Sequence, residues 1–300
     1  MTFQLIKLAV LSLASLAVAA DKPIFGLGYN AKHSNGQCPD LNKVIDDFNT
    51  MLTVTDRIRT FGINDCNQGE LIVQASQATG MKVSLGIFIN QYDQEFNSEF
   101  EKLKDLTYRY RDTFNKNVES VIVGSEAIYR KEITNDALAQ KVYSVKGFLR
   151  DTGIASKVTA ADIKDNWYPS PLLDAVDLMF VNAYPYWEGV PIKSGVDHLW
   201  SKIGEVMART GGKRFVLGET GWPQGGKNFG DAYPSQENQI FFFEQFLCSV
   251  KKAPVPLEYY WFSAFDEAWK GTEADMKWGI FDENRSLKPG YKFPVDCSKY

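Results

Sequence analysis

Short apolar runs alternate with longer amphipathic stretches along the chain. Eight runs are predicted as strands, and they span residues 24–30, 56–61, 82–88, 118–124, 157–161, 176–184, 214–219 and 258–265. Six stretches between them carry apolar residues at helical spacing, at 41–52, 71–79, 99–115, 135–150, 197–209 and 235–250. Alternation of strand and helix is typical of a parallel sheet, and eight such units close into a barrel. We therefore predict an α/β fold, a single-domain (β/α)8 TIM barrel, with a doubly wound open sheet as the alternative.

Length and charge narrow the possible functions. The 300 residues suffice for one barrel domain, which takes roughly 250 residues. A formal net charge of -4 leaves no basic excess, so we expect no nucleic-acid partner and no membrane partner. His33 and His198 are isolated, and no cluster has the spacing of metal ligands. We therefore expect no cofactor and no metal.

Residues 1–20 have the features of a secretory signal peptide. Lys7 precedes a short apolar run at 8–18, and small residues at 17–20 offer a cleavage site. We therefore expect residues 21–300 to form the mature catalytic domain, a monomer that is secreted and lies in the extracellular space or the cell wall.

The four cysteines fit an oxidising compartment and allow three pairings. We favour Cys38 with Cys66 and Cys248 with Cys297, pairing early with early and late with late. The second bridge would tether the C-terminal tail.

Two of the apolar runs end in a glutamate. The first reads VIVGSE at 121–126, and the second reads FVLGE at 215–219 and continues TGWP at 220–223. The C-terminal ends of barrel strands meet at the catalytic face, so Glu126 and Glu219 are expected to face each other there. A carboxylic acid opposite a carboxylate supplies what cleavage of a glycosidic bond requires.

The same two motifs, VGSE at 123–126 and GETGWP at 218–223, resemble glycoside hydrolase family 17 in its fungal cell-wall branch. The family contains endo-β-1,3-glucanases and β-1,3-glucanosyltransferases. The resemblance implies a retaining mechanism, with Glu126 as general acid/base and Glu219 as nucleophile. It also implies β-1,3-glucan and laminari-oligosaccharides as the binding partners.

Further motifs extend the resemblance. NAYPY at 182–186 is similar to the family's substrate-binding motif, which implies Asn182 and Tyr184 as contacts. FDE at 265–267, followed by Lys270, implies Glu267 and Lys270 as supporting residues. Tyr29 stands where relatives place a tyrosine near the nucleophile.

One position departs from the pattern. Many members carry asparagine before the acid/base glutamate, and this chain has Ser125. Serine is shorter, so the partner of the sugar 2-hydroxyl stays open between a water-mediated contact and another residue.

Several aromatic and acidic residues in the strand-end loops are further candidates for sugar contacts, because loops at this face carry function in barrels. We expect Trp222 to form a wall of the cleft and Phe265 to face the reactive centre. The other candidates are Tyr129, Trp187 and Glu188.

We therefore expect a secreted retaining enzyme that is a β-1,3-glucanosyltransferase with hydrolytic activity. The enzymatic alternatives are a purely hydrolytic endo-β-1,3-glucanase and a barrel glycosidase for another β-linkage. The alternative of a different class is a glucan-binding wall protein that performs no catalysis.

Overall fold

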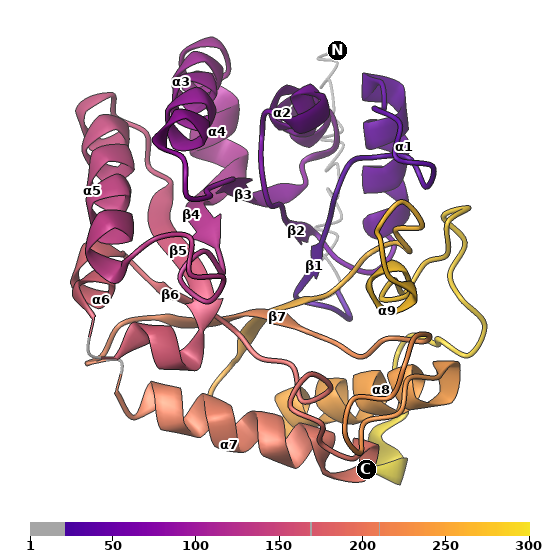
Figure 1. Ribbon diagram of the computed structural model, residues 1–300. Helices are drawn as coiled ribbons and strands as arrows, with labels where there is room; N and C mark the ends of the chain where they lie inside the picture. Colours follow the sequence, from indigo (N-terminus) through magenta and orange to yellow (C-terminus); the bar gives the residue numbers. More distant parts are fainter. Residues whose placement is uncertain (1–21, 169, 210) are drawn as a thin grey trace, which may run out of the picture.

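A computed structural model describes residues 22–168, 170–209 and 211–300, so the predicted signal peptide at 1–20 lies outside the described residues. Eight strands form a central barrel, and helices surround it (Figure 1). The strands are β1 (Gly26–Gly28), β2 (Arg57–Arg59), β3 (Lys82–Ile87), β4 (Val118–Ser125), β5 (Lys157–Ile163), β6 (Met179–Asn182), β7 (Phe215–Thr220) and β8 (Glu258–Trp261).

The strands pair in sequence order, every neighbouring pair is parallel, and β8 pairs with β1 to close the barrel. The predicted TIM barrel is therefore confirmed, and the open-sheet alternative is wrong. Five observed strands lie inside their predicted runs, and β4, β5 and β7 extend one or two residues past the predicted ends.

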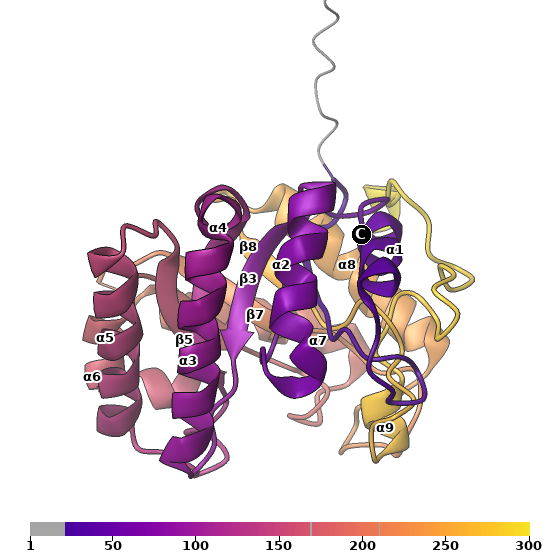
Figure 2. The ribbon, with the colours of Figure 1, turned by 90° about the horizontal axis from the view of Figure 1, so that it is seen from above.

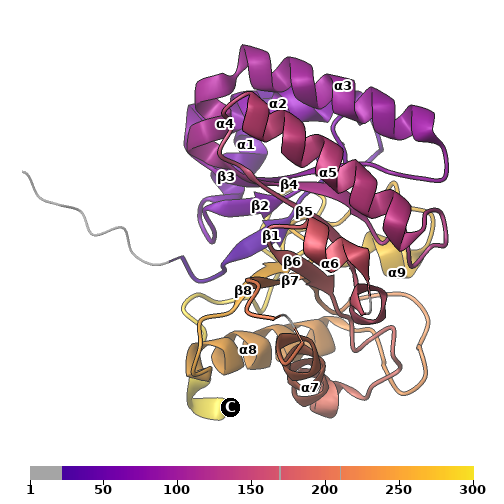
Figure 3. The same ribbon diagram turned by 90° about the vertical axis from the view of Figure 1, so that its left-hand side faces the viewer.

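Helices run back along the outside of the barrel, as Figures 2 and 3 show for α2, α3 and α5 on one side and α7 and α8 on the other. The α-helices are α1 (Leu41–Met51), α2 (Gln68–Thr79), α3 (Asp93–Arg109), α4 (Arg111–Asn117), α5 (Asn135–Asp151), α6 (Pro171–Ala175), α7 (Gly195–Met207), α8 (Gln236–Lys252) and α9 (Glu273–Met276). Short 3-10 turns lie at Asp65–Asn67, Lys164–Trp167, Ile192–Ser194 and Cys297–Lys299.

Local sequence explains where several helices begin. The side chains of Asp40, Thr134 and Ser235 each accept a hydrogen bond from a backbone N–H in the first turn of α1, α5 and α8. The helix predicted at 99–115 is divided in two, because Tyr110 leaves helical geometry between α3 and α4.

The core has two layers. The larger layer fills the space between the strands and the surrounding helices. The smaller layer fills the inside of the barrel, as bulky side chains do in this fold. It consists of Ile122, Ala161, Leu178, Phe180, Val216 and Tyr260. The filled interior makes the barrel a rigid support for the groups at its mouth.

Both disulfides have the pairing that the sequence analysis favoured. Cys38–Cys66 joins the loop after β1 to the loop after β2, with Cα atoms 5.1 Å apart. Cys248–Cys297 joins α8 to the C-terminal turn, with Cα atoms 5.4 Å apart. None of the helices in the described part of the chain has the length and hydropathy that a bilayer span requires.

Removing the second bridge should lower stability without changing the barrel. The bridge closes a sequence separation of 49 residues, so the double variant Cys248→Ala/Cys297→Ala should lose about 2–4 kcal/mol of the free energy of unfolding. Urea denaturation followed by circular dichroism measures this loss. An unfolding free energy equal to that of the wild type would contradict a stabilising role for the bridge.

Candidate active site

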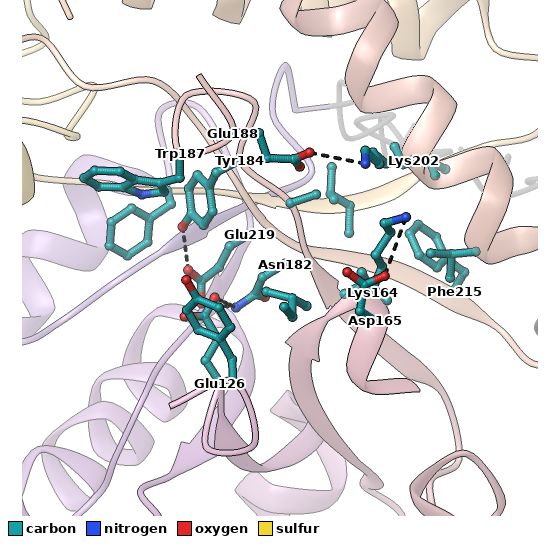
Figure 4. A pocket seen from close by; sticks show the side chains of 18 of the residues that line it. Glu126, Lys164, Asp165, Asn182, Tyr184, Trp187, Glu188, Lys202, Phe215 and Glu219 are labelled. Carbon is teal, nitrogen blue, oxygen red and sulfur yellow. Dashed lines mark hydrogen bonds and ion pairs between the residues drawn. The ribbon is translucent and has the colours of Figure 1, made fainter. Parts of the chain in front are cut away.

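Two carboxylates lie together at the C-terminal mouth of the barrel. Glu219 belongs to β7, and Glu126 follows directly after β4, so the parallel strands bring them to one face. Figure 4 shows both side chains on one side of the cavity, with Asn182 beside them. The closed barrel therefore brings together two residues that lie far apart in the sequence.

The side-chain amide of Asn182 connects the two acids. Its nitrogen Nδ2 donates to Oε1 of Glu126 at 2.8 Å and to Oε1 of Glu219 at 3.1 Å. The two oxygens are therefore separated by at most the sum of these distances, about 5.9 Å. Carboxyl groups of retaining glycosidases lie ~5–5.5 Å apart and those of inverting enzymes ~6.5–9.5 Å apart, so this bound favours the retaining geometry.

A fully buried arginine holds Glu219. Nη1 of Arg59, at the end of β2, forms an ion pair with Oε1 of Glu219 at 2.8 Å. The same nitrogen donates to the carbonyl of Gly218 at 2.7 Å, and Nη2 donates to the hydroxyl of Ser125 at 2.9 Å. A buried charge pair needs further hydrogen bonds to offset desolvation. Both terminal nitrogens of Arg59 have such bonds, whereas its buried Nε has no hydrogen-bond partner among the described residues.

The close packing of Asn182 and Arg59 against the backbone explains why residue 218, next to Glu219, is a glycine. A Cβ atom on Gly218 would lie 2.8 Å from Oδ1 of Asn182 and 3.1 Å from Nη1 of Arg59. Any side chain at this position would therefore displace one of the two groups that bind Glu219.

A tyrosine completes the surroundings of Glu219. The hydroxyl of Tyr184 donates to Oε2 of Glu219 at 2.5 Å. Burial, and then the charge of Glu219, hold the pKa of Tyr184 well above its usual value, so its hydroxyl keeps its proton and remains a donor. With Arg59, Asn182 and Tyr184 all donating to it, Glu219 is surrounded as an ionised carboxylate requires.

The surroundings of Glu126 differ. Burial and then the negative charge of Glu219 raise the pKa of Glu126 to about 7, while the Asn182 hydrogen bond lowers it. Arg59, whose charge lowers the pKa of Glu126, is engaged in an ion pair with Glu219. Glu126 is therefore the carboxyl group that can hold a proton at neutral pH, beside a partner that is stabilised as an anion.

A cavity of about 560 Å³ opens above the two acids. Tyr129, Tyr184, Trp187 and Trp278 supply much of its aromatic lining, and Figure 4 shows Tyr184 and Trp187 among them. Tyr129 is 57% exposed and Trp187 is 39% exposed, so both offer ring faces to a ligand. Among the residues that the structure describes, no group of histidine, cysteine and acidic side chains is arranged to hold a metal ion.

Seven of the residues predicted from the sequence line this cavity. They are Glu126, Tyr129, Asn182, Tyr184, Trp187, Glu188 and Glu219. Glu188 also pairs with Lys202 at 3.3 Å and with His198 at 2.9 Å, so its carboxylate already has partners. Ser125 lies just beneath the acids, where its hydroxyl lies 3.4 Å from Oε1 of Glu219.

Three predicted contacts lie elsewhere. Trp222 is fully buried, where its indole N–H donates to the carbonyl of Tyr233, so the expectation that it forms a cleft wall is wrong. Phe265 is 4% exposed and packs on Phe281, so it belongs to the core instead of facing the reactive centre.

Tyr29 is also removed from the nucleophile. It is 1% exposed, and its hydroxyl donates to Oδ2 of Asp47 at 2.9 Å. The tyrosine beside Glu219 is Tyr184, from the loop after β6. The expected position of Tyr29 near the nucleophile is therefore wrong, because its hydroxyl is turned toward Asp47 of α1.

Glu267 and Lys270 form a supporting pair at the edge of the site. Their ion pair is 2.6 Å long, and Nζ of Lys270 lies 4.8 Å from the ring centre of Phe262, a cavity residue. Burial raises the pKa of Glu267, and Lys270 opposes that effect. The pair therefore lies close to the cavity without lining it.

Arg59 is the main residue that sequence reasoning missed. It lies inside the run predicted as a strand at 56–61 and is the last residue of the observed β2. A charged side chain within a run predicted as a buried strand was the available signal, since such a side chain needs an anion as partner.

Comparisons with known proteins agree with this geometry. The family profile for the BtgE/BtgC glycoside hydrolase domain matches residues 26–279. A Candida albicans glucan 1,3-beta-glucosidase is 28% identical, over 95% of both chains. The glucan endo-1,3-beta-glucosidase btgC of Emericella nidulans is 30% identical over 86% of this chain and 43% of its own length.

A solved structure is similar over almost the whole chain. An active-site mutant of Rhizomucor miehei beta-1,3-glucanosyltransferase, in complex with laminaritriose, is 34% identical and has a TM-score of 0.83. The match covers 92% of this chain and 99% of that one. The corresponding crystal structure of this glycoside hydrolase family 17 enzyme has a TM-score of 0.82.

An eight-stranded barrel with two carboxylates this close at its mouth has the arrangement of a retaining glycoside hydrolase. The matches extend over most of the chain, and the protein belongs to the BtgE/BtgC glycoside hydrolases. The resemblance to family 17 that its motifs indicate is confirmed by the solved structures.

The coupling between the two acids can be measured directly. The Glu126 carboxyl should titrate near pH 7 in the wild type. In Glu219→Gln the neighbouring charge is lost, so the midpoint should fall, while burial keeps it above the usual glutamate value. Carbon-13 NMR of labelled glutamate carboxyls measures both midpoints, with Glu126→Gln used for assignment.

Glu267→Gln is the matched control, because Glu267 is a buried acid at the same mouth and pairs with Lys270. The Glu126 midpoint should stay close to that of the wild type in this variant. A Glu126 midpoint that does not respond to Glu219→Gln would contradict the coupling.

Proposed function

We propose that the protein is a retaining enzyme that cleaves β-1,3-glucan and transfers the glycosyl part that stays bound to the enzyme to an acceptor. The observation that carries the proposal is the Asn182 bridge, which keeps the Glu126 and Glu219 oxygens within about 5.9 Å. The relatives named for β-1,3-glucan activity support the substrate.

In the first step, Oε of Glu219 attacks the anomeric carbon, and the bond from that carbon to the glycosidic oxygen breaks. Glu126 gives its proton to the departing oxygen, so the leaving chain departs as an alcohol. Arg59 and Tyr184 orient the attacking carboxylate. The result is an ester between Glu219 and the donor sugar, with Glu126 left as a carboxylate.

In the second step, Glu126 takes a proton from an acceptor hydroxyl, whose oxygen attacks the anomeric carbon. The bond from that carbon to Glu219 breaks, and Glu219 is released as a carboxylate. Water as acceptor gives hydrolysis, and a glucan hydroxyl gives transfer. The exposed rings of Tyr129 and Trp187 provide surfaces for stacking an acceptor sugar. This surface and the similarity to a glucanosyltransferase support transfer as the main outcome.

The partner of the sugar 2-hydroxyl is best assigned to Asn182. Ser125 stands where many relatives have asparagine, but its hydroxyl is engaged by Arg59 and lies beside Glu219. The amide nitrogen of Asn182 lies between the two acids, where the reacting sugar ring must sit. We therefore propose that Asn182 supplies this contact, with one of its two N–H groups turning from a carboxylate to the 2-hydroxyl when the sugar binds.

The proposal includes a secreted monomer of the extracellular space or cell wall. The signal-peptide features of residues 1–20 and the pairing of all four cysteines support secretion. A neutral polysaccharide agrees with a chain that has no basic excess.

Incubation with a single laminari-oligosaccharide, followed by mass spectrometry of the products, tests the function. Transfer predicts products both shorter and longer than the substrate. Glu219→Ala, prepared in parallel, should give neither, which excludes a contaminating enzyme.

Each alternative has its own outcome in this experiment. Shorter products alone would contradict the transferase assignment and support a purely hydrolytic glucanase. Unchanged substrate that nevertheless binds the protein would support the glucan-binding alternative, and linkage analysis of the longer products defines the bond that is formed.

A further inference from the structure

We propose that Asp162 is a positioning residue that holds the loop of Glu126 in place and, through its charge, keeps Glu126 a strong base. This inference rests on the proposed role of Glu126 as acid/base. The proposed mechanism assigns Asp162 no step, although it is a completely buried carboxylate two strands from the nucleophile.

The contacts of Asp162 are all hydrogen-bond donors. Its Oδ2 accepts from the backbone N–H of Ile128 at 3.1 Å, and its Oδ1 accepts from the N–H of Ile163 at 2.8 Å and from Nδ2 of Asn166 at 2.7 Å. The N–H of Tyr129 also acts on this carboxylate. In the described part of the chain no lysine, arginine or histidine forms an ion pair with it.

Burial of a carboxylate costs free energy, and the hydrogen bonds that Asp162 accepts offset part of that cost. Burial is the largest influence and holds the pKa of Asp162 above its usual value, although the donors from Asn166, Ile163 and the 128–129 segment lower it. Because every partner donates, the site is built around the ionised form. The ionised carboxylate of Asp162 therefore places a negative charge beside the loop that carries Glu126.

The loop needs to be held because Glu126 has an unusual backbone. Its φ is 56°, in the left-handed region that glutamate rarely adopts. Its own N–H donates to the carbonyl of Ala161 at 2.8 Å, and its carbonyl accepts from the N–H of Arg130 at 2.9 Å. Asp162 adds the hold on Ile128, two residues further along. The end of β5 thus fixes both sides of the strained residue.

The groups that shift the pKa of Glu126 come from four strands. Glu219 on β7 and Asp162 on β5 raise its pKa, whereas Arg59 on β2 and the amide of Asn182 on β6 lower it. The hydroxyl of Tyr184 faces the same region and stays neutral. Asp162 is therefore one of the two carboxylates whose charge acts on Glu126.

The two charges differ during the reaction. Once Glu219 is esterified it carries no charge, and Glu126 loses the larger of these two influences at the moment when it must act as base. The charge of Asp162 remains in both steps. It keeps Glu126 basic enough to take the proton of the acceptor.

The test compares two buried carboxylates of the same construction. Asp162→Asn removes the charge beneath the Glu126 loop. Glu99→Gln is the matched control, because Glu99 is 2% exposed and accepts from the N–H groups of Ile63, Asn64 and Phe88. Burial raises the pKa of Glu99 as well, but Glu99 is not among the charges that act on Glu126.

The readout is kcat/KM for cleavage of a laminari-oligosaccharide as a function of pH. In the wild type, kcat/KM should fall as pH rises through about 7, because Glu126 must carry its proton. In Asp162→Asn this limb should move to lower pH by roughly half a unit. In Glu99→Gln the limb should stay at its wild-type position, whatever the loss of thermal stability.

A second variant tests the positioning role by itself. Asp162→Glu keeps the charge but lengthens the side chain, so kcat should fall at least tenfold while the alkaline limb stays in place. This variant decides the positioning claim even when Asp162→Asn does not fold. A wild-type kcat in Asp162→Glu would overturn it.

Failure of the inference and failure of the proposed function are distinguishable. An active wild type whose alkaline limb is the same in Asp162→Asn overturns the electrostatic role of Asp162 and leaves the function intact. A wild type without activity on β-1,3-glucan overturns the proposed function itself.

Discussion

The bridge from Asn182 to both carboxylates is the interaction on which the site depends. One amide nitrogen lies within hydrogen-bond distance of Glu126 and of Glu219, and this fixes the gap in which a sugar must react. The strand ends of β4, β6 and β7 set the three residues at one height of the barrel. A rigid, filled barrel keeps that gap constant, which reaction at two oxygens requires.

Two similar acids acquire opposite roles from their neighbours. Arg59, Asn182 and Tyr184 surround Glu219 with donors, whereas burial and the charge of its partner act on Glu126 and raise its pKa. Burial disfavours the charged form of a carboxyl group wherever no donor or cation compensates it. The buried arginine breaks this symmetry, and so one acid can attack while the other donates a proton.

The sequence allowed the barrel and the two acids to be predicted, because both follow from short-range pattern. Strand and helix periods are local, and the C-terminal end of a parallel strand always lies at the same face. Glu126 and Glu219 could therefore be placed without coordinates. The disulfide pairing was one of three possibilities, and the fold selected it.

The remaining site residues depend on where side chains point, which pattern does not determine. Trp222 and Tyr29 lie next to functional segments but turn into the core, each with a hydrogen-bond partner there. Arg59 and Asp162 escaped notice for the opposite reason. Nothing in the local sequence connects them with the two glutamates, and only the closed barrel brings Arg59 to Glu219 and Asp162 to the loop of Glu126.

The central claim, that Glu219 is the nucleophile of a retaining reaction, is tested most directly by trapping the ester. A laminari-oligosaccharyl fluoride with fluorine also at C2 forms the covalent intermediate and releases it slowly. Intact-mass measurement and peptide mapping should find one added glycosyl group on Glu219, and none in Glu219→Gln. An adduct on a different residue, or turnover that gives the inverted anomer without any adduct, would contradict the account.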